Sequence, residues 1–182
     1  MQRELEIIDE LQKERSISLD NLRCLLETED EAAVETLYAR ARQTAQKIYG
    51  NKVYIRGLIE FTNYCKNDCL YCGIRRSNRN AQRYRLSEKQ ILDCCAVGYE
   101  LGFRTFVLQG GEDGYFTDAR ICDLIAQIKG AYPDCALTLS IGEKPRESYQ
   151  AYFDAGADRY LLRHETADEA HYKRLHPEEM LF

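Results

Sequence analysis

Three cysteines stand close together in the stretch Cys65-Lys-Asn-Asp-Cys69-Leu-Tyr-Cys72, with the spacing C-x3-C-x2-C. Three thiolates this near in sequence can reach one metal centre, because so short a loop folds back on itself. Soft thiolate ligands select zinc, copper(I) or an iron–sulfur cluster. The stretch follows an apolar run, residues 53–61, that predicts a strand, so we expect the thiols on the loop that leaves it.

The number of ligands favours one of these centres. A structural zinc site needs a fourth protein ligand, usually from a second C-x2-C or an H-x3-5-H pair. Three cysteines suit a 4Fe–4S cluster with one iron left open for a substrate or cofactor, a departure from the usual four-cysteine ligation. Zinc and three unrelated thiols remain the alternatives. The other cysteines and the histidines lie elsewhere in the chain, and we expect none of them nearby: Cys24, Cys94, Cys95, Cys122, Cys135, His164, His171 and His176.

Length and composition narrow the class of protein. The chain has 182 residues, enough for one sizeable domain or a smaller domain with an appendage. Its net charge of −5 argues against a nucleic-acid-binding surface. The first residues, MQRELEIIDELQKER, are charged and lack a signal-peptide core, and no apolar run reaches membrane-spanning length. We therefore predict a cytoplasmic protein with reduced thiols that binds neither nucleic acid nor membrane.

Residues 1–49 are predicted to form a helical extension. Apolar residues recur there at helical spacing, and Thr28-Glu29-Asp30-Glu31 fits a capping box that would open a third helix, which Gly50 would end. Periodic apolar stripes usually face a core, so we expect a packed cap without chemistry. The predicted core-facing residues are Leu5, Ile8, Leu11, Leu19, Leu22, Leu25, Leu26, Val34, Leu37, Tyr38, Ala41, Ala45 and Ile48.

Residues 50–182 alternate between strand-like and helix-like segments. We predict strands at residues 53–61, 105–108, 136–141 and 159–162, and helices at 87–101, 118–129, 145–155 and after a cap at 166–169. Successive strand–helix units predict a parallel sheet with right-handed crossovers, an α/β fold. The strands are short and almost continuously apolar, as expected when both faces are covered.

The number of strand–helix units indicates how much of a β/α barrel the chain contains. A complete eight-fold β/α barrel needs about 250 residues. We predict about four β/α units, a partial TIM barrel, with an open sheet as the alternative. The chain stops directly after a helix-like segment, which favours a piece of a longer protein.

Polar residues gather where each predicted strand ends. The cysteines follow the first strand, Gln109-Gly110-Gly111-Glu112-Asp113 the second, residues 140–143 the third and residues 163–165 the fourth. Ligands bind at the carboxyl edge of the strands in barrels and open α/β sheets. The four loops are therefore expected to form one site.

Individual side chains at this edge suggest roles, each with a structural alternative. Gly110 and Gly111 leave the backbone open to close approach, and the acids that follow suit an ammonium group, unless the segment is only a turn. Thr138 and Ser140 share a strand face and can hold a ribose or carboxylate, or can bond to neighbouring backbone.

Two residues of opposite charge follow the last predicted strand. Arg163 and Glu165 can bind a carboxylate and ribose hydroxyls, or can pair with each other. Glu60 and Glu143 are weaker candidates to line the site. The basic stretch 75–85 is expected to be a solvated loop, or to steer anions toward the cluster.

Several stretches together resemble a known family. CKNDCLYC resembles the cysteine signature of the radical S-adenosylmethionine (SAM) superfamily, in which an aromatic residue, here Tyr71, precedes the third cysteine. RGLIEFTNYCKNDCLYCGIRRSN, QRYRLS, VLQGGED, TLSIGE and AGADRYLLRHETA are similar to the HydE-type maturases of FeFe hydrogenases. That branch is related to biotin synthase and methylornithine synthase, and its members are roughly twice as long as this chain.

The resemblance implies roles for particular residues. Cys65, Cys69 and Cys72 would ligate three irons of a 4Fe–4S cluster, and SAM would chelate the fourth through its amino and carboxylate groups. Tyr71 would lie against the adenine. The remaining implied SAM contacts are Gln109, Gly110, Gly111 and Glu112 near the amino group, and Thr138, Ser140, Arg163 and Glu165 on later strands.

The resemblance also implies an activity. A reduced ferredoxin or flavodoxin would supply an electron, and SAM would be cleaved to methionine and a 5′-deoxyadenosyl radical. The expected role is maturation of the FeFe-hydrogenase H-cluster, on a small organometallic substrate and alongside the maturases HydG and HydF. Alternatives are an enzyme like methylornithine synthase or biotin synthase, and a non-catalytic zinc or iron–sulfur module. Because half of the barrel is missing, we expect this chain to ligate a cluster without turning over substrate.

Overall fold

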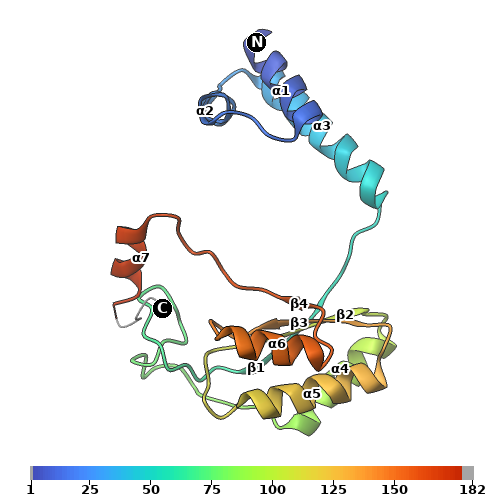
Figure 1. Cartoon of the computed structure of the whole chain (residues 1–182), viewed down its shortest axis with the longest axis vertical. Coiled ribbons are helices and arrows are strands. Elements are labelled where there is room, and N and C mark those ends of the chain that lie inside the picture. The colour runs from blue at the N-terminus through green and yellow to red at the C-terminus, as the bar shows by residue number, and fades with distance from the viewer. Residues whose placement is uncertain (1, 178–182) are drawn as a thin grey trace. The chain divides into compact units, whose positions relative to one another are not determined.

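The computed structural model describes residues 2–177 and divides the chain into two compact units, which meet between Tyr54 and Ile55 (Figure 1). The first unit is helical and the second is an α/β unit. Residues 50–56 follow the last helix of the first unit without joining the sheet.

The first unit contains three helices, α1 (Gln2–Glu14), α2 (Leu19–Glu27) and α3 (Glu31–Tyr49). They pack around Ile7, Ile8 and Leu25. The predicted cap of the third helix is wrong by two residues. The carboxylate of Asp30 accepts hydrogen bonds from the backbone N–H groups of Ala32 and Ala33, whereas Thr28 ends α2.

The apolar stripes of this unit are only partly buried. Tyr38 and Ile48 on α3 are 56% and 67% exposed, and Leu19 and Leu26 on α2 are 80% and 77% exposed. The expectation that these residues form a core is therefore wrong within this unit. Three helices of 13, 9 and 19 residues bury only Ile7, Ile8, Leu25 and Ala33 among their apolar side chains.

The second unit is a four-stranded parallel sheet in the order β1-β2-β3-β4, formed by Gly57–Thr62, Thr105–Gly110, Ala136–Ser140 and Arg159–Tyr160. The connecting helices are α4 (Glu88–Glu100), α5 (Asp118–Ala131) and α6 (Arg146–Asp154), and α7 (Glu169–Leu175) follows β4. Helices α4, α5 and α6 lie against one side of the sheet (Figure 1). The predicted order of strands and helices is confirmed.

Three strands are shorter than predicted, β3 by one residue and β1 and β4 by more. β1 begins at Gly57, which pairs with Phe106 near the start of β2, so residues 53–56 have no neighbouring strand. β4 has two residues because only Arg159 and Tyr160 are in register with β3. Leu161 and Leu162, which were expected to be part of β4, are 45% and 51% exposed.

The two faces of the sheet differ in burial. The face toward the helices is apolar and packed with residues of α4, α5 and α6, and it includes Ile59, Phe61, Phe106, Leu108, Leu137 and Leu139. On the opposite face of β1, Leu58 is 54% exposed and Glu60 is also exposed. The expectation that both faces are covered is therefore wrong for β1, and its open face leads to the site described below.

Capping residues explain where the helices of this unit begin. Ser87 and Gln90 form the predicted reciprocal capping box at the start of α4. The predicted cap at Thr166 is wrong, because Asp168 accepts the hydrogen bond from the backbone N–H of His171 at the start of α7. Among residues 2–177, no helix combines the length and hydrophobicity that a membrane span requires.

Candidate functional site

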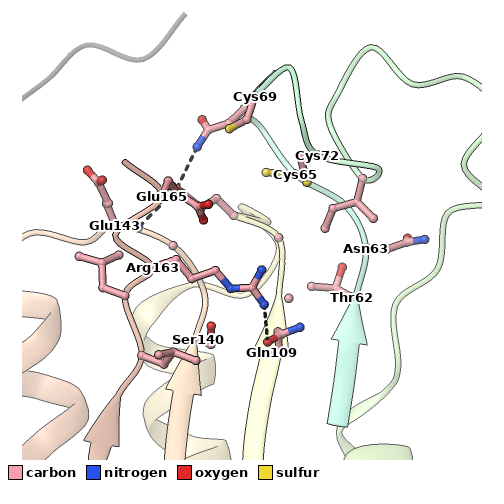
Figure 2. Close-up of a pocket in the computed structure, with 18 of the residues that line it drawn as sticks. Thr62, Asn63, Cys65, Cys69, Cys72, Gln109, Ser140, Glu143, Arg163 and Glu165 are labelled. Carbon is pink, nitrogen blue, oxygen red and sulfur yellow. Dashed lines mark hydrogen bonds between the residues drawn. The ribbon is translucent and has the colours of Figure 1, made fainter. Parts of the chain in front are cut away.

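The carboxyl ends of the four strands border an open pocket of about 250 Å³ (Figure 2). Its lining comes from the loops after all four strands and from α7. Thr138 does not line this pocket: it lies two residues before Ser140 in β3 and is buried. The other predicted site residues line it: Cys65, Cys69, Tyr71, Cys72, Gln109, Gly110, Gly111, Glu112, Ser140, Arg163 and Glu165.

The three cysteines of the motif lie on the loop after β1, and their side chains are partly exposed and form no disulfide. Figure 2 shows them together at one side of the pocket, across from Glu143 and Glu165. Among residues 2–177, no three His, Cys, Asp or Glu side chains converge closely enough to hold a single metal ion. A cluster does not require that convergence, because each thiolate binds a different iron. The three soft donors therefore fit an iron–sulfur cluster.

The basic stretch that follows the cysteines has a structural role. The half-buried guanidinium of Arg83 donates hydrogen bonds to four backbone carbonyls, those of Asn63, Ile74, Arg75 and Asn78. Arg75 donates to the carbonyl of Leu70 at 2.8 Å. These side chains thus hold the loop in shape, so the stretch is more than a solvated loop. Steering of anions by its positive charges stays a prediction.

Gly110 and Gly111 allow the loop after β2 to approach the cysteine loop. A Cβ atom at Gly111 would lie 2.2 Å from the carbonyl oxygen of Tyr64 and 2.8 Å from Cβ of Cys65. A Cβ atom at Gly110 would lie 2.7 Å from Cγ2 of Thr62. The close backbone approach expected at these glycines is present. The neighbours that require it are residues of β1 and of the cysteine loop.

Asp113 anchors the end of the same loop. Its buried carboxylate accepts two hydrogen bonds from Arg85, at 2.6 and 2.9 Å, and one from the hydroxyl of Thr62 at 2.7 Å. Burial alone would raise the pKa of Asp113, but the hydrogen bonds from Arg85 and Thr62 outweigh it and hold that pKa below its ordinary value. Asp113 is therefore committed to Arg85 and Thr62 and is not available to bind an ammonium group.

A row of polar side chains crosses the sheet at the floor of the pocket. The side-chain amide of Gln109 donates to Glu60 at 3.0 Å, and Arg163 donates to the amide oxygen of Gln109 at 3.4 Å (Figure 2). Arg163 thus contacts Gln109 in this part of the pocket. Glu165 has a φ of 58°, in the left-handed region that few non-glycine residues adopt.

Helix α7 contributes residues that the sequence analysis did not assign to the site. The ring Nε2 of His176 lies 2.8 Å from the hydroxyl of Tyr71, and the backbone N–H of Leu70 donates to the carbonyl of Leu175 at 2.9 Å. His171 and His176 have H-x4-H spacing, so a signal was present. The expectation that the histidines lie far from the cysteines is wrong for His176. Further unassigned lining residues are Asn63, Asn67, Ile74, Tyr84, Leu161, Leu162 and Tyr172.

Comparison with known families identifies the second unit. Residues 59–180, which contain the cysteine motif and every strand end described above, match the family described as the radical SAM superfamily. The chain belongs to the radical SAM superfamily. Membership in this superfamily implies, in general, a 4Fe–4S cluster and SAM, and the three thiols on one loop are the donors that such a cluster requires.

Individual relatives agree with this assignment. The chain is 41% identical over 95% of its length to the FeFe hydrogenase maturase subunit HydE of Thermotoga maritima, of which it covers 49%. It is 32% identical over 87% of its length to the 3-methylornithine synthase of Methanosarcina acetivorans, of which it covers 45%. The predicted resemblance to radical SAM enzymes of the HydE type is confirmed. The chain spans about half the length of these curated relatives.

Solved structures of other radical SAM proteins share the fold. The maturase HydG superposes with a TM-score of 0.86 at 28% identity, covering 98% of this chain and 40% of the HydG chain. Methylornithine synthase (PylB) superposes with a TM-score of 0.85 at 28% identity, covering 96% of this chain and 52% of the other. The predicted α/β fold, a partial TIM barrel, is thereby confirmed.

Proposed function

We propose that this chain is part of a radical SAM enzyme that acts in maturation of the FeFe hydrogenase, as HydE does. The observation that carries the proposal is the placement of three cysteines, on a loop held by the protein itself, in the same pocket as the polar ends of the neighbouring strands. The identity to HydE, 41% compared with 32% for 3-methylornithine synthase, favours the hydrogenase branch.

The chain's own residues divide into two groups in this proposal. Cys65, Cys69 and Cys72 hold a 4Fe–4S cluster, and the residues across the pocket hold SAM. When bound, the cluster and SAM supply reductive cleavage of SAM to methionine and a 5′-deoxyadenosyl radical. The protein's contribution is to orient both groups and to keep water from the reacting atoms.

The residues that we assign to SAM, apart from Thr138, line the pocket. Tyr71 would lie against the adenine, and Gly110, Gly111 and Glu112 would lie near the amino group. Arg163 binds the carboxylate and Glu165 the ribose hydroxyls, because a guanidinium and a carboxylate suit these partners. Gln109 and Ser140 line the space between them, and Thr138 supports Ser140 from within β3.

The proposal extends to the protein's setting. Residues 1–49 are a helical extension, and residues 50–182 correspond to the N-terminal half of the barrel. A reduced ferredoxin or flavodoxin donates the electron in the cytoplasm, the substrate is a small organometallic compound, and HydG and HydF act in the same maturation. A methylornithine-synthase-like activity is the second candidate, supported by the structural similarity to PylB.

Anaerobic reconstitution with iron and sulfide tests the central part of the proposal. We expect about four irons and four sulfides per chain and an electron paramagnetic resonance (EPR) signal of a reduced 4Fe–4S cluster that changes when SAM is added. One zinc per chain, with no iron–sulfur absorbance, would contradict the proposal and favour a structural metal module.

A further inference from the structure

The imidazole of His176 lies directly after α7 and packs against two tyrosines. It stacks on the ring of Tyr172, with the centroids 4.0 Å apart and the planes 21° from parallel. The ring of Tyr71 is nearly perpendicular to it, with the centroids 5.3 Å apart and the planes at 77°. His176 is 5% exposed and Tyr71 is 48% exposed. A buried imidazole therefore supports a tyrosine that is half open to solvent.

The hydrogen bonds of this imidazole determine which ring nitrogen carries the proton. Nδ1 of His176 lies 2.9 Å from the backbone carbonyl oxygen of Tyr172, which can only accept, so Nδ1 carries the hydrogen. In a neutral ring Nε2 is then an acceptor. The hydroxyl of Tyr71, 2.8 Å from Nε2, therefore donates to it. The backbone of α7 thus sets the direction in which the Tyr71 hydroxyl points.

Helix α7 is itself attached to two of the loops that border the pocket. The backbone N–H of Leu70, in the cysteine loop, donates to the carbonyl of Leu175 at 2.9 Å. The hydroxyl of Tyr172 donates to the carboxylate of Glu143, in the loop after β3, at 3.2 Å. Because both ends of this connection belong to the same unit, His176 is held at a defined place beside the cysteine loop.

We propose that His176 is a positioning residue that holds the ring of Tyr71 in the orientation in which it meets the adenine of SAM. This inference rests on the proposed function, in which Tyr71 lies against the adenine. A half-exposed tyrosine has several rotamers available, and fixing one of them costs conformational entropy. Because the contact with His176 fixes the ring before SAM arrives, that loss does not oppose SAM binding.

The metal-free chain provides a test that needs no cofactor, because the sequence has only three histidines. NMR of the chain labelled with nitrogen-15 at histidine, at about pH 8, identifies the protonated nitrogen of each neutral ring. The resonances that His176→Gln removes belong to His176. We expect its proton on Nδ1, and we expect Tyr71→Phe to shift its Nε2 resonance, because that nitrogen loses its donor. A proton on Nε2, or no shift in Tyr71→Phe, would overturn the inference.

Reconstituted protein tests the consequence for SAM, through the EPR change on titration with SAM. His176→Ala should weaken SAM binding about fivefold, the effect of losing roughly one hydrogen bond, and should keep the iron content of wild type. Tyr71→Phe should weaken it by a similar factor, and the double variant should not exceed the larger single effect, because both remove the same bond.

Two further variants separate this role from a general loss of structure. His176→Gln should restore much of the affinity, because its side-chain amide oxygen can accept from the Tyr71 hydroxyl. His171→Ala is the matched control: it removes an exposed histidine from the same helix, so the SAM affinity and the iron content should both equal those of wild type. Circular dichroism of each variant checks that the fold is retained.

Three results would overturn the inference. Loss of iron in His176→Ala would mean that the imidazole serves the cluster. Wild-type SAM affinity in His176→Ala would mean that Tyr71 needs no support. Weaker binding in His176→Ala with wild-type binding in Tyr71→Phe would mean that His176 acts on SAM without Tyr71. A wild-type cluster that SAM leaves unchanged would instead contradict the proposed function, and the NMR spectra would still decide whether His176 holds Tyr71.

Discussion

The loop after β1 and the segment after β4 both reach the pocket, but they are held very differently. The cysteine loop is bound by the guanidinium of Arg83, by Glu112 and by the backbone of α7. The segment after β4 follows a strand of two residues, and Leu161 and Leu162 are about half exposed. One side of the site is rigidly built in this part of the chain, and the other is lightly supported.

Because of this difference, cluster ligation and SAM binding should depend on the protein in different ways. A loop held by charge-assisted hydrogen bonds is organised before a metal arrives, unlike a zinc finger, which folds only on metal binding. Arg163, by contrast, has a 3.4 Å contact with Gln109. Cluster ligation should therefore tolerate changes near β4, and SAM affinity should not.

The largest expected effect follows from the close contact between the loops after β1 and β2. Gly111→Ala would place a methyl group 2.2 Å from the carbonyl oxygen of Tyr64, and backbone atoms cannot yield easily. We expect a loss of about 3 kcal/mol in the free energy of unfolding and failure to bind the cluster. Urea denaturation and iron analysis measure both.

Gly114→Ala is the matched control for that substitution. It lies three residues further along the same loop, and an added Cβ there has no neighbour within 4 Å. Its free energy of unfolding should stay within about 0.5 kcal/mol of wild type. Equal effects of the two substitutions would mean that the loops do not press together as described.

A smaller effect is expected at Asp113, which fixes the loop after β2 from its other end. Asp113→Asn removes the charge that Arg85 binds and should lower the free energy of unfolding by about 2 kcal/mol at pH 7. The folded-state pKa of Asp113 lies below its unfolded value. Its contribution is therefore fully present above the unfolded pKa, about 3.9, and is lost as the pH falls through the folded pKa.

Urea denaturation from pH 7 down to pH 2 checks this dependence. The gap between wild type and Asp113→Asn should narrow as the pH falls below about 4, because the wild-type carboxyl becomes protonated. A gap that stays constant over this range would show that the Asp113 charge does not stabilise the fold.

The smallest effect on stability is expected on the lightly supported side. Arg163→Ala should change the free energy of unfolding by no more than about 0.5 kcal/mol, because the side chain is exposed. Iron content after reconstitution should equal that of wild type. The affinity for SAM, measured from the EPR change on titration, should fall roughly tenfold with loss of one charged contact. If Arg163→Ala also lost iron, cluster ligation would depend on the segment after β4, and the contrast with the cysteine loop would be wrong.

Much of the site could be predicted from the sequence because its signals are local. The C-x3-C-x2-C spacing, the paired glycines of the QGGED segment and the rule that parallel strands end at one edge are enough to predict that the cysteines, Gln109, Ser140 and Arg163 share one site. The capping box at Ser87 was equally local.

Other features depend on contacts that leave no pattern in the chain. The hydrogen bonds of Arg83 go to backbone carbonyls, which any sequence provides. The short length of β4 is set by its register with β3. Each of these is decided by tertiary packing, so periodicity and spacing could not predict it.

The account depends most on the claim that Cys65, Cys69 and Cys72 hold a cluster with one open iron. Anaerobically reconstituted wild-type chain and Cys69→Ser should be reduced and compared by EPR with and without SAM, with Cys94→Ser as the control thiol. The account predicts a 4Fe–4S signal that SAM alters in the wild type and in Cys94→Ser, and its loss in Cys69→Ser. An identical signal in all three proteins, or a signal that SAM leaves unchanged, would contradict it.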